Sequence, residues 1–167
     1  MNINPNTIDP FYRYKMPKPN TRFAGGGNGS YTFFDNIYDV SSAINTPSHV
    51  LFNFISKSLG SSSNYEKKTI TGHHKNCIII DEIYKFIKEF VMCQNCSIPE
   101  VKPSVQGSKK KKQLVFDCSA CGCKYIKTST NKLFDKTIDN IIKNVDKYEF
   151  KKGNIVLAEK KTLFNPL

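Results

Sequence analysis

The spacing of apolar residues changes along the first half of the chain and predicts the order of its elements. Aromatic and β-branched residues over 31–34 predict a strand, and apolar residues at helical spacing over 37–45 predict a helix that stops before a proline. Segment 50–58 alternates and predicts a second strand, with an inner face made of Val50, Phe52 and Phe54. A turn over 60–64 and a third strand over 65–70 follow.

Two later segments have the period of an amphipathic helix. Over 77–91 one apolar stripe faces away from the acidic and basic residues, and it consists of Cys77, Ile80, Ile83, Tyr84, Ile87, Phe90 and Val91. Cys77 is therefore interpreted as a core residue, and the helix leads directly into Cys93. The same pattern over 133–148 predicts a C-terminal helix.

The net charge of the chain indicates which class of partner it favours. Its 167 residues include 25 Lys and Arg against 14 Asp and Glu, so the formal net charge is +11. This favours nucleic acid or another phosphate-rich partner, and the alternative is a solvated lysine-rich surface. No apolar run reaches the roughly 18 residues of a membrane span, and residues 1–20 lack the apolar stretch of a signal peptide. We therefore expect a soluble, intracellular protein with no membrane partner.

Cysteine spacing predicts a metal site. Two C-x2-C pairs, separated by 21 residues, supply Cys93, Cys96, Cys118 and Cys121. Four thiolates at this spacing form a closed tetrahedral site for one structural zinc ion, which supports a fold and catalyses nothing. Thiol redox chemistry is the alternative for a single pair. Cys123 is interpreted as a free thiol in the next strand that could replace a ligand on loss of zinc.

These observations predict an α+β fold with an attached zinc module. The predicted units are an extended N-terminal tail with a glycine loop (1–29), a mixed α/β core (30–91), a zinc ribbon (92–128), a helix packing on core or ribbon (129–149), and a tail or linker (150–167). The glycine cluster is interpreted as a mobile loop that lacks a phosphate-binding fingerprint. His73 is interpreted as a helix-start residue.

Four consecutive lysines stand between the two cysteine pairs, at the expected tip of the ribbon hairpin. They form a local positive charge that favours contact with RNA or the ribosome, and the alternative is a hydrated loop. These residues are Lys109, Lys110, Lys111 and Lys112.

Three motifs occur in the order found in one family. They are Phe11-Tyr12-Arg13-Tyr14-Lys15-Met16-Pro17, Gly27-Asn28-Gly29 and Phe90-Val91-Met92-Cys93-x2-Cys96. Over residues 8 to about 145 the chain resembles the N-terminal domain of eukaryotic translation initiation factor 5, which shares its ribbon with the beta subunit of initiation factor 2. The resemblance implies a core similar to initiation factor 1.

The resemblance also implies a function. The family is expected to be a cytoplasmic GTPase activator of initiation factor 2 during start-codon selection, and it is not itself an enzyme. Arg13 matches the arginine proposed to act in trans on the GTP of the gamma subunit. Implied partners are the gamma and beta subunits of initiation factor 2, the small ribosomal subunit and initiator tRNA, and we expect a monomer.

Further candidate contacts to RNA, phosphate or the ribosome are Lys15, Lys18, Arg22, Asn28, Tyr31 and Asn53. The family has lysines in two basic loops where this chain has Tyr31 and Asn53, which weakens phosphate attraction there. The family's C-terminal helical-repeat domain is not found after residue 150, so the sequence is either a piece of a longer protein or a natural form without that domain. An alternative function is therefore a module that binds the ribosome and initiator tRNA and biases start-codon choice without stimulating hydrolysis. A third hypothesis is a protein similar to the beta subunit that docks on the gamma subunit and has no activating role.

Overall fold

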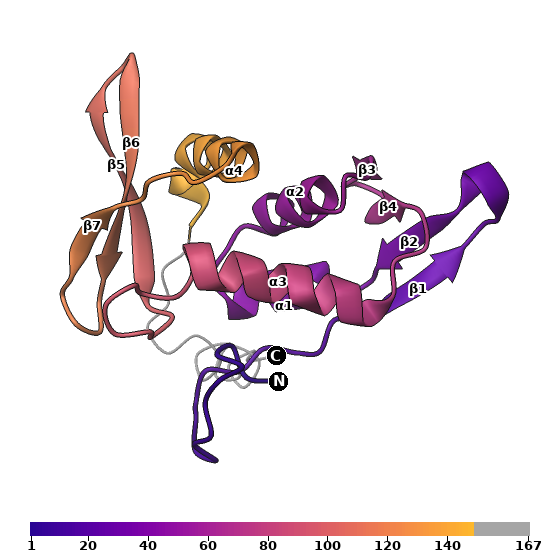
Figure 1. Cartoon of the computed structure of the whole chain (residues 1–167), viewed down its shortest axis with the longest axis horizontal. Coiled ribbons are helices and arrows are strands. Elements are labelled where there is room, and N and C mark those ends of the chain that lie inside the picture. The colour runs from indigo at the N-terminus through magenta and orange to yellow at the C-terminus, as the bar shows by residue number, and fades with distance from the viewer. Residues whose placement is uncertain (149–167) are drawn as a thin grey trace, which may run out of the picture.

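The computed structural model describes residues 1–148 and forms an elongated molecule with a helical centre (Figure 1). One end carries a four-stranded antiparallel sheet in the order β1-β2-β4-β3, and the other carries a three-stranded sheet in the order β5-β6-β7. The mixed α/β class is confirmed. None of the described helices is both long and apolar enough to cross a membrane.

The first sheet and three helices make the core. The sheet consists of β1 (Thr21–Ala24), β2 (Tyr31–Phe34), β3 (Ser63–Asn64) and β4 (Thr69–Thr71), and the 3-10 turn η1 (Gly27–Gly29) joins the first two strands. Helices α1 (Ile37–Ala43), α2 (Ser48–Ser58) and α3 (Asn76–Phe90) follow. The predicted strand at 31–34 and helix after it are confirmed, while most of 65–70 is the turn between β3 and β4.

Segment 50–58 is helical, so the predicted second strand is wrong. The alternation of Val50, Phe52 and Phe54 is real, but Leu51 and Ile55 are apolar too. In α2 all five are buried, because a helix between α1, α3 and α4 has apolar neighbours on more than one side. A strand with one buried face would have exposed Leu51 and Ile55.

The long helix α3 is confirmed over most of 77–91, but its buried stripe differs from the prediction. The buried residues are Ile79, Ile83, Phe86, Ile87 and Phe90. Cys77 lies two residues before Ile79, on another side of the helix, and it is exposed. Its interpretation as a core residue is therefore wrong.

The second sheet forms a long hairpin with a short third strand. It consists of β5 (Val101–Ser108), β6 (Lys111–Cys118) and β7 (Lys124–Ile126). Helix α4 (Lys132–Lys143) and the 3-10 turn η2 (Val145–Lys147) follow, in place of one helix to residue 148. Asn131 caps α4, since its Oδ1 accepts the backbone N–H of Phe134 at 2.9 Å. The predicted tail at 150–167 lies outside the described residues.

An aromatic cluster holds α4 on the core, and an ion pair with a buried lysine holds the ribbon there. Phe134 of α4 packs on Phe54 and Phe90, with ring centroids 6.4 and 5.6 Å away. The Lys127 ammonium, after β7, donates to the Glu89 carboxylate of α3 at 2.7 Å, and the Lys127 side chain is only 4% exposed. Because apolar packing and a shielded charge pair act together, the ribbon and the core have a defined relative position.

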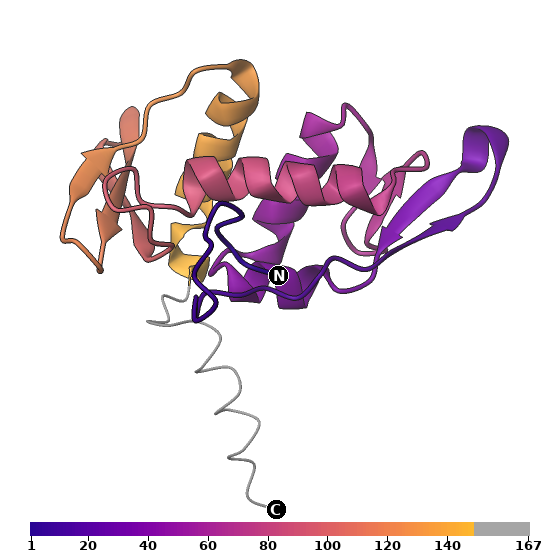
Figure 2. The same ribbon diagram turned by 60° about the horizontal axis from the view of Figure 1, so that its bottom comes forward.

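Residues 1–16, which we call the N-terminal loop, fold back on themselves. The backbone N–H of Ile3 donates to the carbonyl of Tyr14 at 2.9 Å, and that of Met16 donates to Met1 at 2.8 Å. Ile3 and Met16 are buried in the core, and Tyr84 of α3 donates its hydroxyl proton to the Asn2 carbonyl. Figure 2 shows the loop crossing the end of α3 nearest the ribbon. The expected extended tail is therefore a docked loop over residues 1–16, because these two apolar side chains anchor it.

Candidate functional site

The four predicted metal ligands converge from two turns. Cys93 and Cys96 lie in the turn after α3, while Cys118 ends β6 and Cys121 lies in the turn before β7. Their sulfur atoms all lie within 4.8 Å of one another, and the pairs Cys93–Cys121 and Cys96–Cys118 are each 3.7 Å apart. A tetrahedron with Zn–S bonds of about 2.3 Å has sulfur atoms about 3.8 Å apart. Two of the sulfur pairs already have this spacing and the others lie within about 1 Å of it, so the donor set fits a tetrahedral zinc site.

The two cysteine turns have the same pattern of backbone hydrogen bonds. In the first, Cys93 N–H donates to the Ile98 carbonyl and Ser97 N–H donates to the Cys93 carbonyl. In the second, Cys118 N–H donates to the Cys123 carbonyl and Gly122 N–H donates to the Cys118 carbonyl. Each cysteine pair is therefore held by an equivalent tight turn, as expected for a site whose ligands are placed before the metal binds.

Hydrogen-bond donors lower the pKa of one clustered thiol, whereas burial raises the pKa of another. The backbone N–H of Cys123, followed by the Asn95 side chain, lowers the pKa of Cys121 to about 6. Burial raises the pKa of Cys96 to about 12. A metal ion removes the conflict, because ligation replaces the proton on every thiol and neutralises the charge that burial penalises. Cys123 itself is half-buried just before β7, and burial raises the pKa of its thiol.

The equivalent turns allow a matched stability test. The residue after each second cysteine has a positive φ, 56° at Ser97 and 72° at Gly122. Ser97→Gly should raise the free energy of unfolding by up to about 1 kcal/mol, because a side chain disfavours this conformation. Gly122→Ala should lower it by about 1 kcal/mol, and an added Cβ there meets nothing within 4 Å. Urea unfolding of the zinc-loaded chain measures both, and shifts in the same direction would contradict the shared design.

Arg13 is a partly exposed cation held against the ribbon. Its Nη2 donates to Oε1 of Glu100 at 3.2 Å and to the hydroxyl of Tyr14 at 2.9 Å, and Tyr14 donates its own proton to Glu100. The guanidinium carbon also lies 4.9 Å from the centre of the Tyr14 ring. The hydrogen bond to Tyr14 and the charge of Glu100 raise the pKa of Arg13, so it is always a cation.

Glu100 is the contact that sequence reasoning missed. Its side chain is 4% exposed, and it lies between Cys96 and β5. The available signal was one acidic residue in a ribbon whose other charges are mostly lysines. Its partner is 87 residues away in the sequence, so no local pattern could identify the pair.

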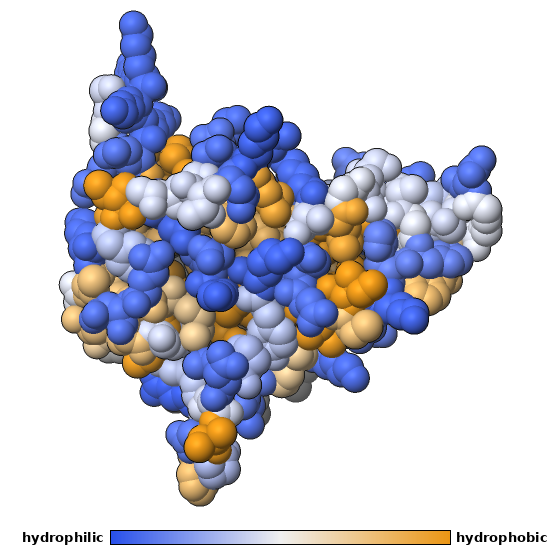
Figure 3. All heavy atoms as spheres, in the orientation of Figure 1, coloured by the Kyte–Doolittle hydropathy of each residue, from blue (hydrophilic) through white to orange (hydrophobic). Residues whose placement is uncertain are grey.

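Apart from Asn53, the candidate RNA contacts lie in three separate places. Lys15 and Lys18 follow Arg13 and are exposed. Arg22, Asn28 and Tyr31 belong to the β1–β2 hairpin, where Nε of Arg22 contacts both Asp35 oxygens at 3.1 and 3.0 Å. The four lysines form the exposed tip of the β5–β6 hairpin, and Figure 3 shows hydrophilic residues along this arm.

Two predicted residue placements change. Asn53 lies in the middle of α2 and is half-buried, so its expected position in a loop is wrong. His73 precedes α3 by three residues and stacks on Phe23 of β1, with ring centroids 4.8 Å apart. It is therefore a partner of the hairpin and not the first residue of the helix.

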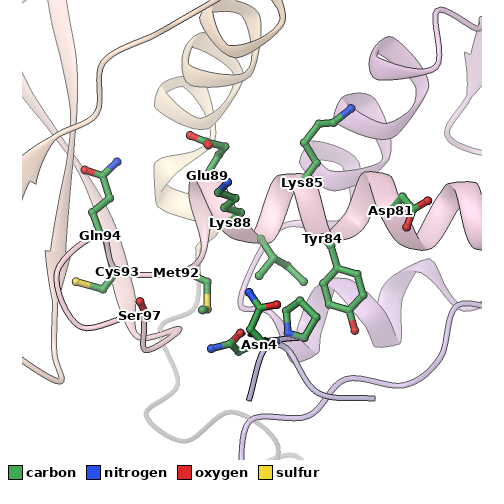
Figure 4. A pocket seen from close by; sticks show the side chains of 13 residues that line it. Asn4, Asp81, Tyr84, Lys85, Lys88, Glu89, Met92, Cys93, Gln94 and Ser97 are labelled. Atoms are coloured by element: carbon green, nitrogen blue, oxygen red, sulfur yellow. Dashed lines mark hydrogen bonds between the residues drawn. The ribbon is translucent and has the colours of Figure 1, made fainter. Parts of the chain in front are cut away.

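A cavity of about 850 Å³ lies between the N-terminal loop, α3 and the first cysteine turn (Figure 4). Its charged lining is balanced, since it includes Lys85 and Lys88 together with Asp81 and Glu89. Lys85 is already paired with Glu82 at 3.0 Å. The mixed charge does not favour a phosphate ligand, and Arg13 does not line the cavity.

Comparison with known proteins identifies the family. A family model described as the domain found in initiation factors 2B and 5 matches residues 4–124, a range that contains Arg13 and all four clustered cysteines. Eukaryotic translation initiation factor 5 of Caenorhabditis elegans is 33% identical over 129 residues, which cover 75% of this chain and 29% of the relative. The factor 5 of Mus musculus is 32% identical over 150 residues, which cover 87% of this chain and 34% of the relative.

The factor 5 of Saccharomyces cerevisiae is 34% identical over 126 residues, which cover 73% of this chain and 30% of the relative. The chain thus spans about a third of the length of these relatives. The match of the family model to most of the chain confirms the resemblance drawn from the motifs. The chain belongs to the family of the domain found in initiation factors 2B and 5, in the form present in eukaryotic translation initiation factor 5.

Proposed function

We propose that the chain works in translation initiation as a GTPase activator of initiation factor 2, during start-codon selection on the small ribosomal subunit. Arg13 acts in trans on the GTP of the gamma subunit, so the chain is not itself an enzyme. The observation that carries the proposal is an exposed arginine with unused donors in a domain of the factor 5 type. The beta subunit and initiator tRNA are further partners in the cytoplasm, and the chain acts as a monomer.

The chemistry of phosphoryl transfer explains the choice of arginine. Negative charge spreads over the γ-phosphate oxygens in the transition state, and a guanidinium neutralises it with directed N–H groups. Among the described residues, Nη2 of Arg13 is the only one of its nitrogens with a hydrogen-bond partner. Its Nε–H and Nη1–H groups remain available, and the side chain is 58% exposed. The guanidinium can therefore bind a phosphate from outside.

The zinc ion supplies no reaction chemistry in this proposal. Cys93, Cys96, Cys118 and Cys121 hold one zinc ion as a structural cross-link between the end of α3 and the hairpin. When bound, the ion neutralises thiolates and fixes the ribbon. The ribbon in turn holds Glu100, which contacts Arg13.

The direct test is single-turnover hydrolysis of GTP on initiation factor 2 bound with initiator tRNA to small ribosomal subunits. Adding the chain should accelerate hydrolysis in proportion to its occupancy of the complex. A chain that binds these particles yet leaves the rate unchanged would contradict activation.

The second candidate function is a ribosome-binding and tRNA-binding module that biases start-codon choice without stimulating hydrolysis. It is favoured by the exposed lysines at one end of the molecule and by Arg22, Asn28 and Tyr31 at the other. Tyr31 is 42% exposed and has a face on which a base could stack. The Arg13→Ala variant separates the candidates, because only the first requires Arg13 for its output.

Binding through the β5–β6 tip predicts a steep salt dependence. Replacing Lys109, Lys110, Lys111 and Lys112 with alanine should reduce the slope of log affinity against log salt by about 3, because each lost phosphate contact removes close to one released counterion. The matched control replaces four other exposed lysines, Lys132, Lys136, Lys143 and Lys147, and has the same net charge. Binding to small subunits measures both, and equal losses in the two variants would assign the effect to net charge alone.

A further inference from the structure

The contact between Arg13 and Glu100 differs from an ordinary surface ion pair. The chain has a second arginine, Arg22, whose side chain is 62% exposed, close to the 58% of Arg13. Arg22 pairs with Asp35, which is 35% exposed and can be solvated without a partner. Glu100 is 4% exposed, so its carboxylate loses most of its hydration and needs donors from the protein.

The N-terminal loop supplies those donors. Among the described residues, the side-chain hydrogen-bond partners of Glu100 are Tyr14 and Arg13 alone, and both act on Oε1. Withdrawing Arg13 would leave a buried charge with one neutral donor, which is strongly unfavourable. The guanidinium therefore stays at Glu100, because moving it away would leave the buried carboxylate without a charged partner.

The backbone of Glu100 is fixed by both cysteine turns. Its N–H donates to the Ile98 carbonyl at 2.9 Å, next to the first turn, and its carbonyl accepts the N–H of Ser119 at 3.0 Å, within the second turn. The Ile98 carbonyl also accepts the N–H of Cys93 at 3.1 Å. Because both turns converge on the metal site, the position of Glu100 is tied to the position of the four cysteines.

The other side of the contact is also fixed. The Tyr14 carbonyl accepts the N–H of Ile3, which is fully buried, and the Tyr14 ring lies 5.6 Å from that of Tyr12. The guanidinium lies over the Tyr14 ring while bonding to its hydroxyl. One residue thus restricts Arg13 by a cation–π contact and by a hydrogen bond, and neither hydrogen bond of the guanidinium uses its Nε–H or Nη1–H groups.

We propose that Glu100 and Tyr14 are positioning residues that hold the Arg13 guanidinium through Nη2, so that its Nε and Nη1 groups are oriented for an incoming phosphate. This inference rests on the proposed function and adds a second requirement to it, an acidic residue of the zinc ribbon. A guanidinium fixed before the partner arrives loses less side-chain entropy on binding and reaches the phosphate in one orientation.

The maximal rate of single-turnover GTP hydrolysis tests the positioning role. Glu100→Gln keeps the volume and removes the charge, and it should lower the maximal single-turnover rate about tenfold or more. The chain concentration at half-maximal rate should stay within about twofold, since the groups that bind the complex are retained. Tyr14→Phe should have a smaller effect in the same direction. Glu66→Gln removes an equal charge from the exposed β3–β4 turn and should change neither value.

A double variant separates positioning from a general structural role. If Glu100 acts through Arg13, Glu100→Gln should have no further effect on the rate in an Arg13→Ala background. A merely structural role would lower the rate by the same factor in both backgrounds.

Nuclear magnetic resonance gives a readout that needs no GTPase. The Nε–Hε region should contain two signals, because Arg13 and Arg22 are the only arginines. We expect slowed guanidinium rotation at Arg13 in the unmodified chain, and Glu100→Gln should abolish it at Arg13 while the Arg22 signal is unchanged. Arg22→Lys assigns the two signals.

The outcomes distinguish the positioning role of Glu100 from GTPase activation itself. If Arg13→Ala abolishes activation while Glu100→Gln leaves the rate unchanged or raises it, the positioning role is wrong and activation stands. A raised rate would mean that Glu100 withholds the guanidinium. If the unmodified chain does not accelerate hydrolysis at all, both proposals fail. An Arg13 signal insensitive to Glu100→Gln also overturns the positioning role.

Discussion

Replacing Arg13 with alanine should reduce the stimulated rate of GTP hydrolysis about a thousandfold, close to the rate without the chain. The guanidinium supplies charge that is needed only in the transition state, so its loss affects the chemical step. Arg13→Lys should recover a small part of the rate, because an ammonium keeps the charge but lacks the directed fork of donors. Single-turnover hydrolysis on small subunits measures the three chains side by side.

Binding controls make this result interpretable. The loop is anchored by Ile3 and Met16, so Arg13→Ala should keep the fold and the binding to small subunits, at a lower free energy of unfolding because Glu100 loses its charged partner. Reduced hydrolysis with unchanged binding would place the effect on catalysis. Unchanged hydrolysis in Arg13→Ala would show that the finger role is wrong and would favour the ribosome-binding module.

Removing zinc should unfold the ribbon. Ligation by four thiolates contributes on the order of 10 kcal/mol to small zinc modules, more than the β5–β6 hairpin and the short strand β7 can replace. Cys118→Ala should have the same effect as a chelator, because Cys118 is a buried member of the four-cysteine cluster that also ends β6. Amide exchange should lose protection throughout the hairpin, while α1 and α2 keep it. Native mass spectrometry should find one zinc ion per chain.

The chain contains matched controls for the zinc prediction. Cys77 is exposed on α3, and Cys123 lies outside the group of clustered sulfur atoms. Cys77→Ala and Cys123→Ala should therefore retain one zinc ion and a protected hairpin. Protection that persists after complete removal of metal would contradict a structural role for the four cysteines.

Local patterns explain which parts of the molecule could be predicted. The cysteine spacing and the period of α3 each depend on residues that are near one another in the sequence, so the metal site and this helix could be inferred. The basic hairpin tip followed from the same spacing, because a chain that must return from Cys96 to Cys118 needs a turn between them. The motif around Arg13 identified the family.

The remaining features depended on contacts between distant segments. Helix α2 lies between several apolar neighbours, so both alternating sets of its residues are buried and the strand pattern was misleading. The N-terminal loop has no period of its own, and Ile3 and Met16 order it by packing in the core. Glu100 gained its partners only through this docking. Composition and spacing contain no signal for such pairs.

A reconstruction of the chain with GTP-loaded initiation factor 2 on small ribosomal subunits, trapped with a transition-state analogue of GTP hydrolysis, tests the central claim most directly. We predict that Nε or Nη1 of Arg13 lies about 3 Å from an oxygen or fluorine at the γ-phosphate position, with Nη2 still on Glu100. A complex in which the chain is bound and Arg13 faces solvent, far from the nucleotide, would contradict the account.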